Sequence, residues 1–189
     1  MPSPMDLTAQ ASNDKRELRA RWVTPAAVSI LEQVTSALRE ARPWVALIAQ
    51  LPRAAEVENG RDLRGAPLGR FTLEGIDLRN CALGFAELDR GRFSRTDFRG
   101  SELAYATLTA ASLARANFEA CLMPFARLDR ASLVEAVLAR AVLSGASLVG
   151  ADCSRADLRG AILMGTVTDG AILDDALLEG ARFLKFAAP

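Results

Sequence analysis

The chain has 189 residues, half of them apolar, with 23 basic and 23 acidic side chains. That balance leaves no net field to attract nucleic acid or anionic lipid, and the length admits one domain with an appended segment. Histidine is absent, which excludes the commonest general base and the commonest metal ligand.

The cysteines and the first residues indicate a reducing compartment. Cys81, Cys121 and Cys153 lie too far apart for a CxxC site, and their odd number argues against the disulfide framework of a secreted domain. Residues 1–14 lack the apolar core of a signal peptide, and no apolar run reaches the ~18 residues of a membrane span. We therefore expect a soluble, cytoplasmic protein with no membrane partner. The basic residues are nearly all arginine, which is typical of GC-rich bacterial genomes.

Helical periodicity dominates the segment that follows residue 13. Residues 1–13 are polar, contain Pro, Ser and Asn, and are predicted to form a disordered tail. Thr24 and Pro25 read as an N-cap followed by proline at the first helical position, which predicts a helix ending near Arg42. A short third helix is predicted around Trp44.

We interpret residues 14–57 as an N-terminal α-helical cap, because a repeat array needs its first unit covered. A separate partner-binding helical module is the alternative. In the cap interpretation Trp22 and Trp44 lie buried, near Phe71 and Ile76.

A five-residue period then runs through residues 58–185 without a frame shift. Every fifth residue from Leu63 to Phe183 is Leu or Phe, except for Met123, Cys153 and Thr168. The residue two places before each of them is usually Ala, as at Ala106 and Ala146. A period of five fits neither a straight helix nor a strand, and leucine-rich and hexapeptide repeats need other spacings.

This pattern resembles the pentapeptide-repeat family, whose units read Ala-(Asp/Asn)-Leu-x-x and are matched best by residues 116–120 and 156–160. The resemblance implies an all-β solenoid, a right-handed quadrilateral parallel β-helix in which four units make one coil. The central Leu or Phe and the preceding small residue point inward. Residues 58–185 are then expected to form about six coils, a rod of roughly 30 Å, with a tail at 186–189.

Two further features of the repeat lead to predictions. Glycine is concentrated at the last position of the unit, which suits a type II turn with positive φ. Thr168 places a hydroxyl in the apolar column and is predicted to mark the weakest unit, near a C-terminal end that exposes strand edges.

A cluster of arginines, Arg90, Arg92, Arg95 and Arg99, is the one candidate for a nucleic-acid site. The interleaved Phe93 and Phe98 point inward in this register, so neither is free to stack on a base. Nucleic acid is therefore not an expected partner.

No other residues form a recognisable chemical site. The three cysteines occupy inward positions and are interpreted as small buried hydrophobes. An acidic stretch near the C-terminus, Asp169, Asp174, Asp175 and Glu179, is interpreted as a solvated face rather than a cation site. We expect no enzymatic activity, cofactor, metal or small-molecule substrate.

One face of the predicted square is almost uncharged. On the face that follows Leu83 and its equivalents at steps of twenty, fifteen outward positions hold one charge, Glu102, whereas each other face holds at least seven. The face presents these side chains: Phe85, Tyr105, Phe125, Leu122, Val142, Ile162 and Met164. An aromatic ladder that stiffens the coils is the alternative interpretation, but it does not explain the missing charges. We predict a partner-binding face, covered by an unknown protein, by a second copy in a homodimer, or by the chain's own N-terminal helices.

The leading functional hypothesis is a non-catalytic protein-interaction scaffold that docks a protein partner or itself. The alternative comes from the family resemblance, because some members mimic DNA and bind, protect or inhibit type II topoisomerases such as gyrase. That mimicry requires a strongly acidic surface. Residues 61–189 carry sixteen basic and sixteen acidic side chains, so the scaffold hypothesis is preferred.

Overall fold

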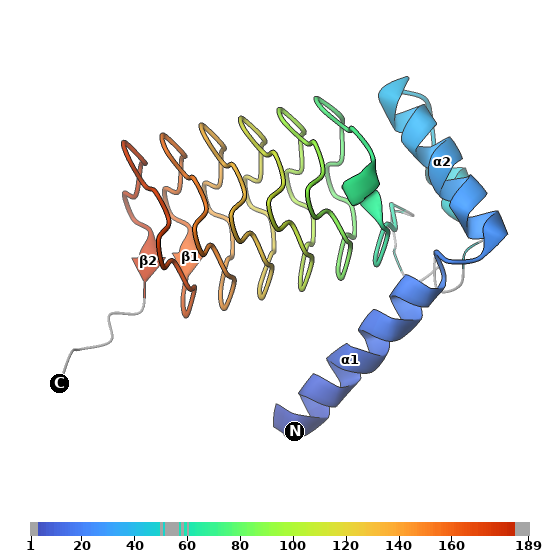
Figure 1. Ribbon diagram of the computed structural model, residues 1–189, viewed down its shortest axis with the longest axis horizontal. Helices are drawn as coiled ribbons and strands as arrows, with labels where there is room; N and C mark the ends of the chain where they lie inside the picture. Colours follow the sequence, from blue (N-terminus) through green and yellow to red (C-terminus); the bar gives the residue numbers. More distant parts are fainter. Residues whose placement is uncertain (1–3, 50, 52–56, 58, 60, 184–189) are drawn as a thin grey trace.

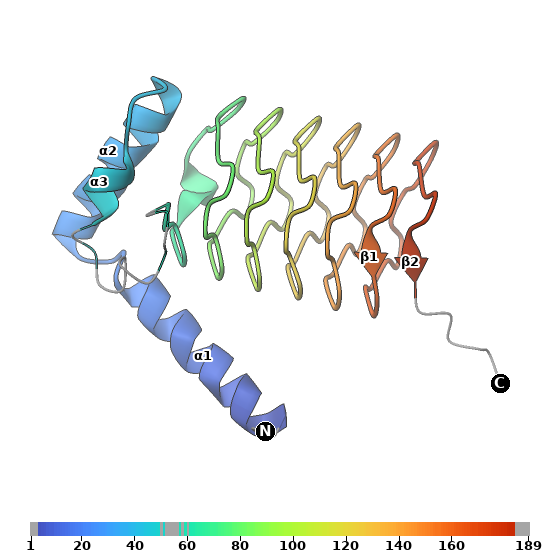
Figure 2. The ribbon, with the colours of Figure 1, turned by 180° about the vertical axis from the view of Figure 1, so that it is seen from behind.

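The computed structural model describes residues 4–49, 51, 57, 59 and 61–183 (Figure 1). Three helices come first, α1 (Pro4–Ala20), α2 (Pro25–Arg39) and α3 (Val45–Ile48). A rod of stacked turns of chain follows, with the helices at one end and the last described residues at the other (Figures 1 and 2). Within the rod are a short 3-10 helix, η2 (Leu68–Arg70), and two strands, β1 (Ile162–Leu163) and β2 (Arg182–Phe183).

Helix α1 begins earlier than the sequence predicts. Residues 4–13 are helical, although disorder is predicted across residues 1–13, of which 1–3 lie outside the described part. Proline fits the first turn of a helix, where its missing N–H has no partner to lose. Ala9, Gln10 and Ala11 then favour the helical state, so helix propensity prevails over polar composition here.

Helix α2 confirms the predicted start. The Thr24 side chain accepts a hydrogen bond from the Ala27 N–H at 3.2 Å, with Pro25 at the first helical position. The helix ends at Arg39, where Ala41 adopts a φ of 51°, three residues before the predicted end. Its buried stripe includes Leu31, Val34 and Leu38.

The rod is built with a register of twenty residues. Parallel bridges join Asp62 to Ala82 and continue to the pair Asp157 and Leu177, each residue meeting the one twenty places further along. The strands β1 and β2 continue the same register, with Ile162 opposite Arg182. Four five-residue units therefore make one turn of the rod, and each unit is too short to give more than an isolated bridge at most positions.

The inward positions agree with the predicted register. The central side chains are buried from Leu63 to Leu163, and the small residues before them are mostly buried as well. Phe98 and Phe118 stack inside the rod, with ring centroids 4.7 Å apart. Thr168 departs from the prediction because it is exposed, so its hydroxyl loses no hydration. No described residue follows to cover it.

The corners require a left-handed backbone at almost every unit. From Gly65 to Gly180, every fifth residue has positive φ, with Arg70 in η2 the exception. The turns are closed by hydrogen bonds such as that from the Ala106 N–H to the Leu103 carbonyl at 3.0 Å. Positive φ at the third residue and this bond are features of a type II turn, as predicted. Many of these residues are not glycine, so the repeat imposes a conformation that most of its corner residues do not favour.

The helices pack on the first turn of the rod through a continuous apolar core. Trp22, Trp44 and Ile76 are buried, as predicted, and belong to one cluster with Leu31 and Leu63. Phe71 packs against that cluster from its edge. Residues 50 and 52–56 of the predicted cap, residues 58, 60, 184 and 185 of the predicted rod, and the predicted tail 186–189 lie outside the described residues.

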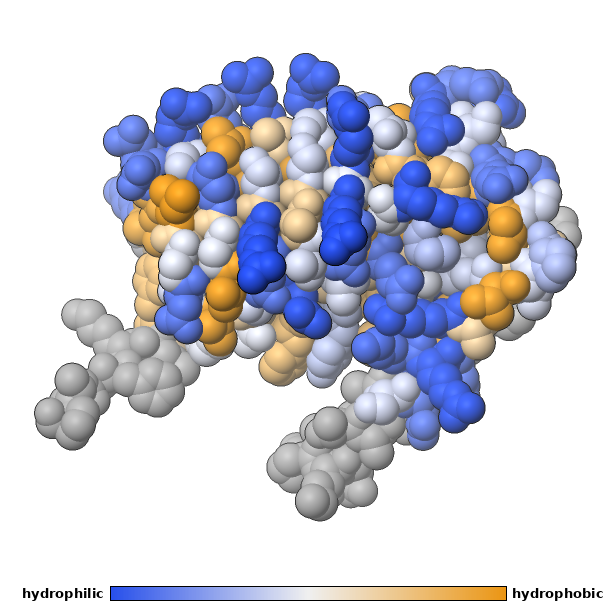
Figure 3. All heavy atoms as spheres, in the orientation of Figure 1, coloured by the Kyte–Doolittle hydropathy of each residue, from blue (hydrophilic) through white to orange (hydrophobic). Residues whose placement is uncertain are grey.

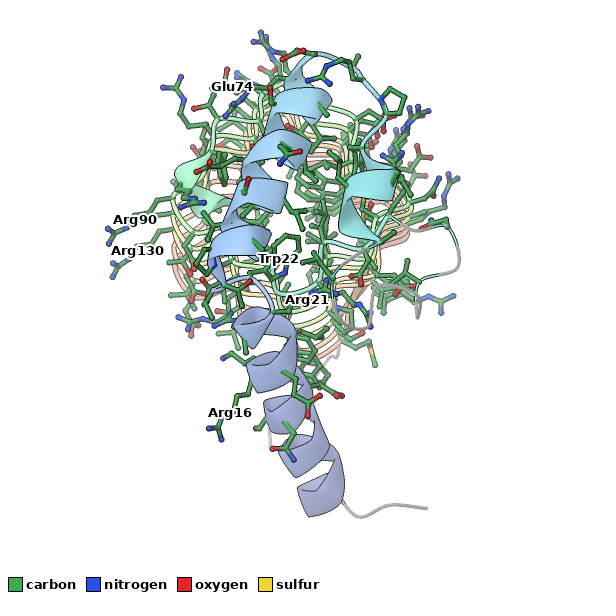
Figure 4. All side chains as sticks on the ribbon, turned by 90° about the vertical axis from the view of Figure 1, so that its right-hand side faces the viewer. Arg16, Arg21, Trp22, Glu74, Arg90 and Arg130 are labelled. Carbon is green, nitrogen blue, oxygen red and sulfur yellow. The ribbon has the colours of Figure 1, made fainter. Side chains whose placement is uncertain are left out.

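A buried ion pair joins helix and rod. Arg21 donates two hydrogen bonds to the Asp62 carboxylate, both at 2.8 Å, and its guanidinium also contacts the Arg64 carbonyl at 2.9 Å. Trp22 Nε1 donates to the same carbonyl at 2.8 Å. Figure 4 shows Arg21 and Trp22 together at the end of the rod, where α1 meets α2. Burial alone raises the pKa of Asp62, but the hydrogen bonds from Arg21 and Arg64 outweigh it and hold that pKa below its ordinary value.

Candidate docking face

The seven predicted side chains lie along one side of the rod. We call this set, Phe85, Tyr105, Phe125, Leu122, Val142, Ile162 and Met164, the apolar face. Bridges join Leu122 to Val142 and Val142 to Ile162, so these three form one column at consecutive turns. All seven are exposed or half-buried, which confirms that they point outward.

An aromatic stack forms the second column of the apolar face. The rings of Phe85 and Tyr105 are parallel within 6°, with centroids 5.1 Å apart, and those of Tyr105 and Phe125 are also 5.1 Å apart. The spacing follows from the rod, because successive turns lie one hydrogen-bonded strand apart. Tyr105 is 39% exposed and Phe125 is 53% exposed, so the stack leaves much ring surface in water.

Backbone conformation sets the direction of these rings. Phe85, Tyr105 and Phe125 all sit at corner positions with φ near 60°. The next residue in the column is Gly145, where an added Cβ would lie 2.6 Å from a Phe125 ring carbon. Phe125 therefore extends over a corner that only glycine leaves open.

The N-terminal helices leave the apolar face uncovered. Arg19 at the end of α1 donates to the Phe85 carbonyl at 3.3 Å and pairs with Glu87 at 2.7 Å. Beyond that contact α1 diverges from the rod, on the side where β1 and β2 lie (Figures 1 and 2). Leu122 and Phe125 remain exposed, so the described side chains of the helices do not cover these two residues.

The cysteines are unreactive in this setting. Burial raises the pKa of Cys81 to about 11 and that of Cys121 and Cys153 to about 12. All three are free thiols, and Cys121 donates to the Phe98 carbonyl at 2.8 Å. In the described part of the chain, no group of His, Cys, Asp and Glu could hold a metal ion, and no helix is long and apolar enough to cross a bilayer.

The arginine cluster of the sequence is dispersed over the rod. Arg92 pairs with Glu74 at 2.9 Å, and Arg99 pairs with Asp97 at 2.6 Å. Arg90 points outward on another side, in line with Arg130 (Figure 4). The buried Phe93 and Phe98 are unavailable for base stacking, as predicted. Arg92 and Arg95 line one pocket with Arg115 and Arg155, whereas Arg90 and Arg99 lie on the neighbouring faces, so the structure brings together only two of the four.

The sequence analysis missed the apolar character of the last turn. Val167, Ile172 and Leu177 are exposed at the outward position that precedes each inward residue. The signal was present in the sequence, because the residues twenty places earlier are Ser147, Asp152 and Asp157. The number of charges on each face does not reveal that these outward positions change from polar to apolar in the last turn.

Comparison with known proteins identifies the five-residue repeat. The family model for pentapeptide repeats (8 copies) matches residues 76–113, 92–123, 111–148 and 126–165. Among curated proteins no sequence matches this chain. Pentapeptide-repeat proteins are right-handed quadrilateral β-helices and are generally non-catalytic.

Several solved structures are similar. HetL, a pentapeptide repeat protein involved in heterocyst differentiation regulation from the cyanobacterium Nostoc sp. strain PCC 7120, is 37% identical over 68% of this chain and 64% of its own, with a TM-score of 0.38. A pentapeptide repeat protein from the Arabidopsis thaliana thylakoid lumen is 27% identical over 51% of this chain and 67% of its own, with a TM-score of 0.48. QnrB1, a plasmid-mediated fluoroquinolone resistance protein, is 15% identical over 66% of this chain and 80% of its own, with a TM-score of 0.34.

The chain spans less than two thirds of the length of HetL, and all three TM-scores lie below 0.5. These alignments therefore assign neither a partner nor an activity. The family model and the unbroken five-residue register agree with each other, and this chain belongs to the pentapeptide-repeat family.

Proposed function

We propose that the protein is a non-catalytic interaction scaffold, a rigid β-helical rod that docks a protein partner through its apolar face. The observation that carries the proposal is the combination of the exposed stack of Phe85, Tyr105 and Phe125 with a single charge, Glu102, among fifteen outward positions. Contiguous exposed apolar surface on a soluble domain usually marks an interaction site. A cytoplasmic setting is part of the proposal.

The rest of the molecule supports this role by fixing the face in space. We propose that residues 61–183 form about six coils and that α1, α2 and α3 cap the first of them. The buried Trp22 and Trp44 and the Arg21–Asp62 pair favour a cap over an independent module. A rod whose turns are bonded to their neighbours presents a backbone that is already ordered, which lowers the entropy cost of binding.

Site-specific crosslinking tests the proposal directly. A photoreactive phenylalanine analogue replaces Tyr105 in one variant and Ala110 in its control, in the cells that make the protein. Ala110 is an exposed corner residue with φ of 55° on the adjacent face, so the two sites match in backbone and exposure. We expect a protein crosslinked to position 105 and none to position 110. Equal crosslinking at both positions contradicts the apolar face as the docking surface.

Light scattering separates a foreign partner from a second copy. Tyr105→Glu and Val142→Asp introduce negative charge on the apolar face. The control substitutions Ala110→Glu and Val137→Asp introduce the same charges at equivalent positions of the two adjacent faces. If the wild-type protein is a dimer and only Tyr105→Glu and Val142→Asp make it monomeric, the apolar face mediates self-association. A monomer in all cases, with the crosslink at position 105 retained, indicates a foreign protein.

Topoisomerase mimicry is the alternative function and is not favoured. A protein that takes the place of DNA needs a dense negative surface, whereas many acidic side chains here are neutralised by neighbouring arginines, as in the pairs Arg79–Asp77 and Arg159–Asp157. A gyrase supercoiling assay tests it, and strong inhibition at micromolar protein would reverse this ranking.

A further inference from the structure

A groove with an excess of basic side chains runs along one side of the rod. It has a volume of about 480 Å³, and four arginines and two glutamates contribute to its lining. We call these six residues the basic groove: Arg92, Arg95, Arg115, Arg155, Glu74 and Glu135. Four positive and two negative charges leave it with a net charge of +2, although the chain as a whole is neutral.

The basic groove and the apolar face lie on opposite sides of the rod. Four units make one turn, and residues 92–95 follow residues 82–85 by two units. Hydrophilic side chains project from the upper edge of the rod in Figure 3, the side on which Figure 4 places Glu74. The two surfaces can therefore be occupied at the same time.

Arg95 offers an unpaired guanidinium at the groove. It is exposed at a corner with φ of 61°, and no described residue forms an ion pair with it. The preceding corner in its column is Gly75, where an added Cβ would meet no atom within 4 Å, so space is open on that side. The following corner is Arg115. Like charges on neighbouring strands repel each other, so an anion beside Arg95 and Arg115 is stabilised.

The same column shows how the groove holds a carboxylate. Glu135 occupies the corner after Arg115 and pairs with Arg115 at 2.7 Å and with Arg155 at 2.8 Å. Arginines at the corners on either side therefore reach one carboxylate between them. A guanidinium has five N–H donors, so Arg115 can bind a second carboxylate while it holds Glu135. The chain supplies no such carboxylate next to Arg95 among its described residues.

The length and the floor of the groove indicate which kind of anion fits. Three turns separate Arg95 from Arg155, which is roughly 14 Å at the spacing of hydrogen-bonded strands and matches four to five residues of extended peptide. The floor is made by small side chains, among them Ala114 and the hydrogen-bonded pair Ser94 and Ser112, at 2.9 Å. No described aromatic side chain lines the groove, so it offers no surface for stacking a nucleic-acid base.

We propose that the basic groove binds an extended acidic segment of a partner protein. Carboxylates of the segment accept hydrogen bonds from Arg95 and Arg115, and a further one reaches Arg92 or Arg155. Arginine clusters recognise acidic motifs in this way, and complementary charge also speeds the encounter. The inference does not rest on the apolar face, because it concerns the opposite side of the rod.

Two synthetic peptides of eight residues test the proposal with the full chain. Glu alternates with Ser in one peptide, and Gln replaces Glu in the other. We expect the Glu peptide to bind at least about tenfold more tightly in calorimetric titration, with the difference shrinking as salt is added. Inorganic phosphate and an oligothymidylate of eight nucleotides are titrated in parallel. Either of them binding as tightly as the Glu peptide would assign the groove to anions in general or to nucleic acid and overturn the proposal.

Matched arginine variants locate the binding. Arg95→Gln with Arg115→Gln removes two charges from the groove, and Arg90→Gln with Arg130→Gln removes two from the adjacent face. All four are exposed corner residues with φ between 57° and 61°, and Figure 4 shows Arg90 and Arg130 on a different side from Glu74. We expect the first pair to weaken the Glu peptide at least about tenfold and the second to change it less than about twofold. Equal losses in the two variants contradict the groove as the binding site.

Glu135→Gln provides a gain of affinity that loss of fold cannot imitate. It frees Arg115 and Arg155 for the peptide and raises the net charge of the groove to +3, so the Glu peptide should bind at least about threefold more tightly. Glu119→Gln is the control, because both glutamate side chains are about one third exposed, at 33% and 32%, and both pair with arginine. Thermal melting confirms that each variant is folded. Affinity unchanged by Glu135→Gln, or no binding of the Glu peptide at millimolar concentration, overturns the proposal.

Discussion

At the scale of single residues, the corner positions carry most of the strain in the rod. Gly145 and Gly165 occupy the same column with φ of 67° and 68°, and they differ in what a Cβ would meet. At Gly145 it meets the Phe125 ring at 2.6 Å, and at Gly165 the nearest atom is 4.0 Å away. Gly165→Ala should cost about 1–2 kcal/mol for the left-handed backbone alone.

Gly145→Ala should cost more than Gly165→Ala and should also displace Phe125 from the aromatic stack. Thermal melting gives the stabilities, and near-ultraviolet circular dichroism of Tyr105, the single tyrosine, reports on the stack. Identical melting temperatures and spectra for the two variants would contradict the contact between Phe125 and Gly145.

Asp62 makes the junction between helix and rod sensitive to acid. Its folded pKa lies below the unfolded value near 4, so the carboxylate stabilises the fold above about pH 4, and this contribution is lost as pH falls through the folded pKa. Asp62→Asn leaves the Arg21 charge buried without its counter-ion and should lower the unfolding free energy by about 3 kcal/mol at pH 7. Fluorescence of Trp22 and Trp44, the only tryptophans, measures the opening.

Asp157→Asn is the control for the acid-sensitive junction. Asp157 pairs with the exposed Arg159 at 2.7 Å, and a surface pair contributes less than about 1 kcal/mol. A junction that resists acid equally in wild type and Asp62→Asn would show that the pair does not hold the helices in place.

At the scale of elements, we expect the helices to protect the first turn of the rod. Leu31 and Val34 of α2 are fully buried in the cluster that contains Leu63. Deleting residues 1–52 uncovers that apolar surface, so we expect the truncated rod to aggregate. Deleting residues 1–13 keeps Leu18, Arg21 and Trp22 and should leave the oligomeric state and the stability of the protein unchanged. Light scattering and thermal melting compare the two, and a soluble, equally stable rod without residues 1–52 would refute the cap.

At the scale of the whole molecule, stability should decline from the centre of the rod towards the last described turn. Each turn of the rod is bonded to its two neighbours, so a turn with one neighbour unfolds locally at a lower free energy than one with two. The amide of Leu113 donates to Ser132 at the centre of the rod, and that of Leu158 donates to Leu177 of the last turn. We expect hydrogen exchange at Leu158 to be at least tenfold faster than at Leu113. Uniform protection along the rod would contradict this decline.

The sequence alone determined the register of the rod and the face on which each residue lies. The period of five carries the resemblance to the pentapeptide-repeat family, and that resemblance implied the outward direction of Phe85, Tyr105 and Val142. Helix α2 was predictable for a similar reason, since Thr24 and Pro25 act locally. These features depend on near neighbours in the chain or on exact repetition.

Tertiary structure alone decided the features that join distant residues. Arg21 and Asp62 are 41 residues apart, and no local pattern predicts that they meet in a buried pair. Arg90 and Arg99 are close in sequence to Arg92 and Arg95 but lie on other faces of the rod, whereas Arg92 and Arg95 line one pocket. Thr168 stands at a position that is buried in the earlier turns and is still exposed, because burial in a solenoid depends on the next turn as well as on the residue itself.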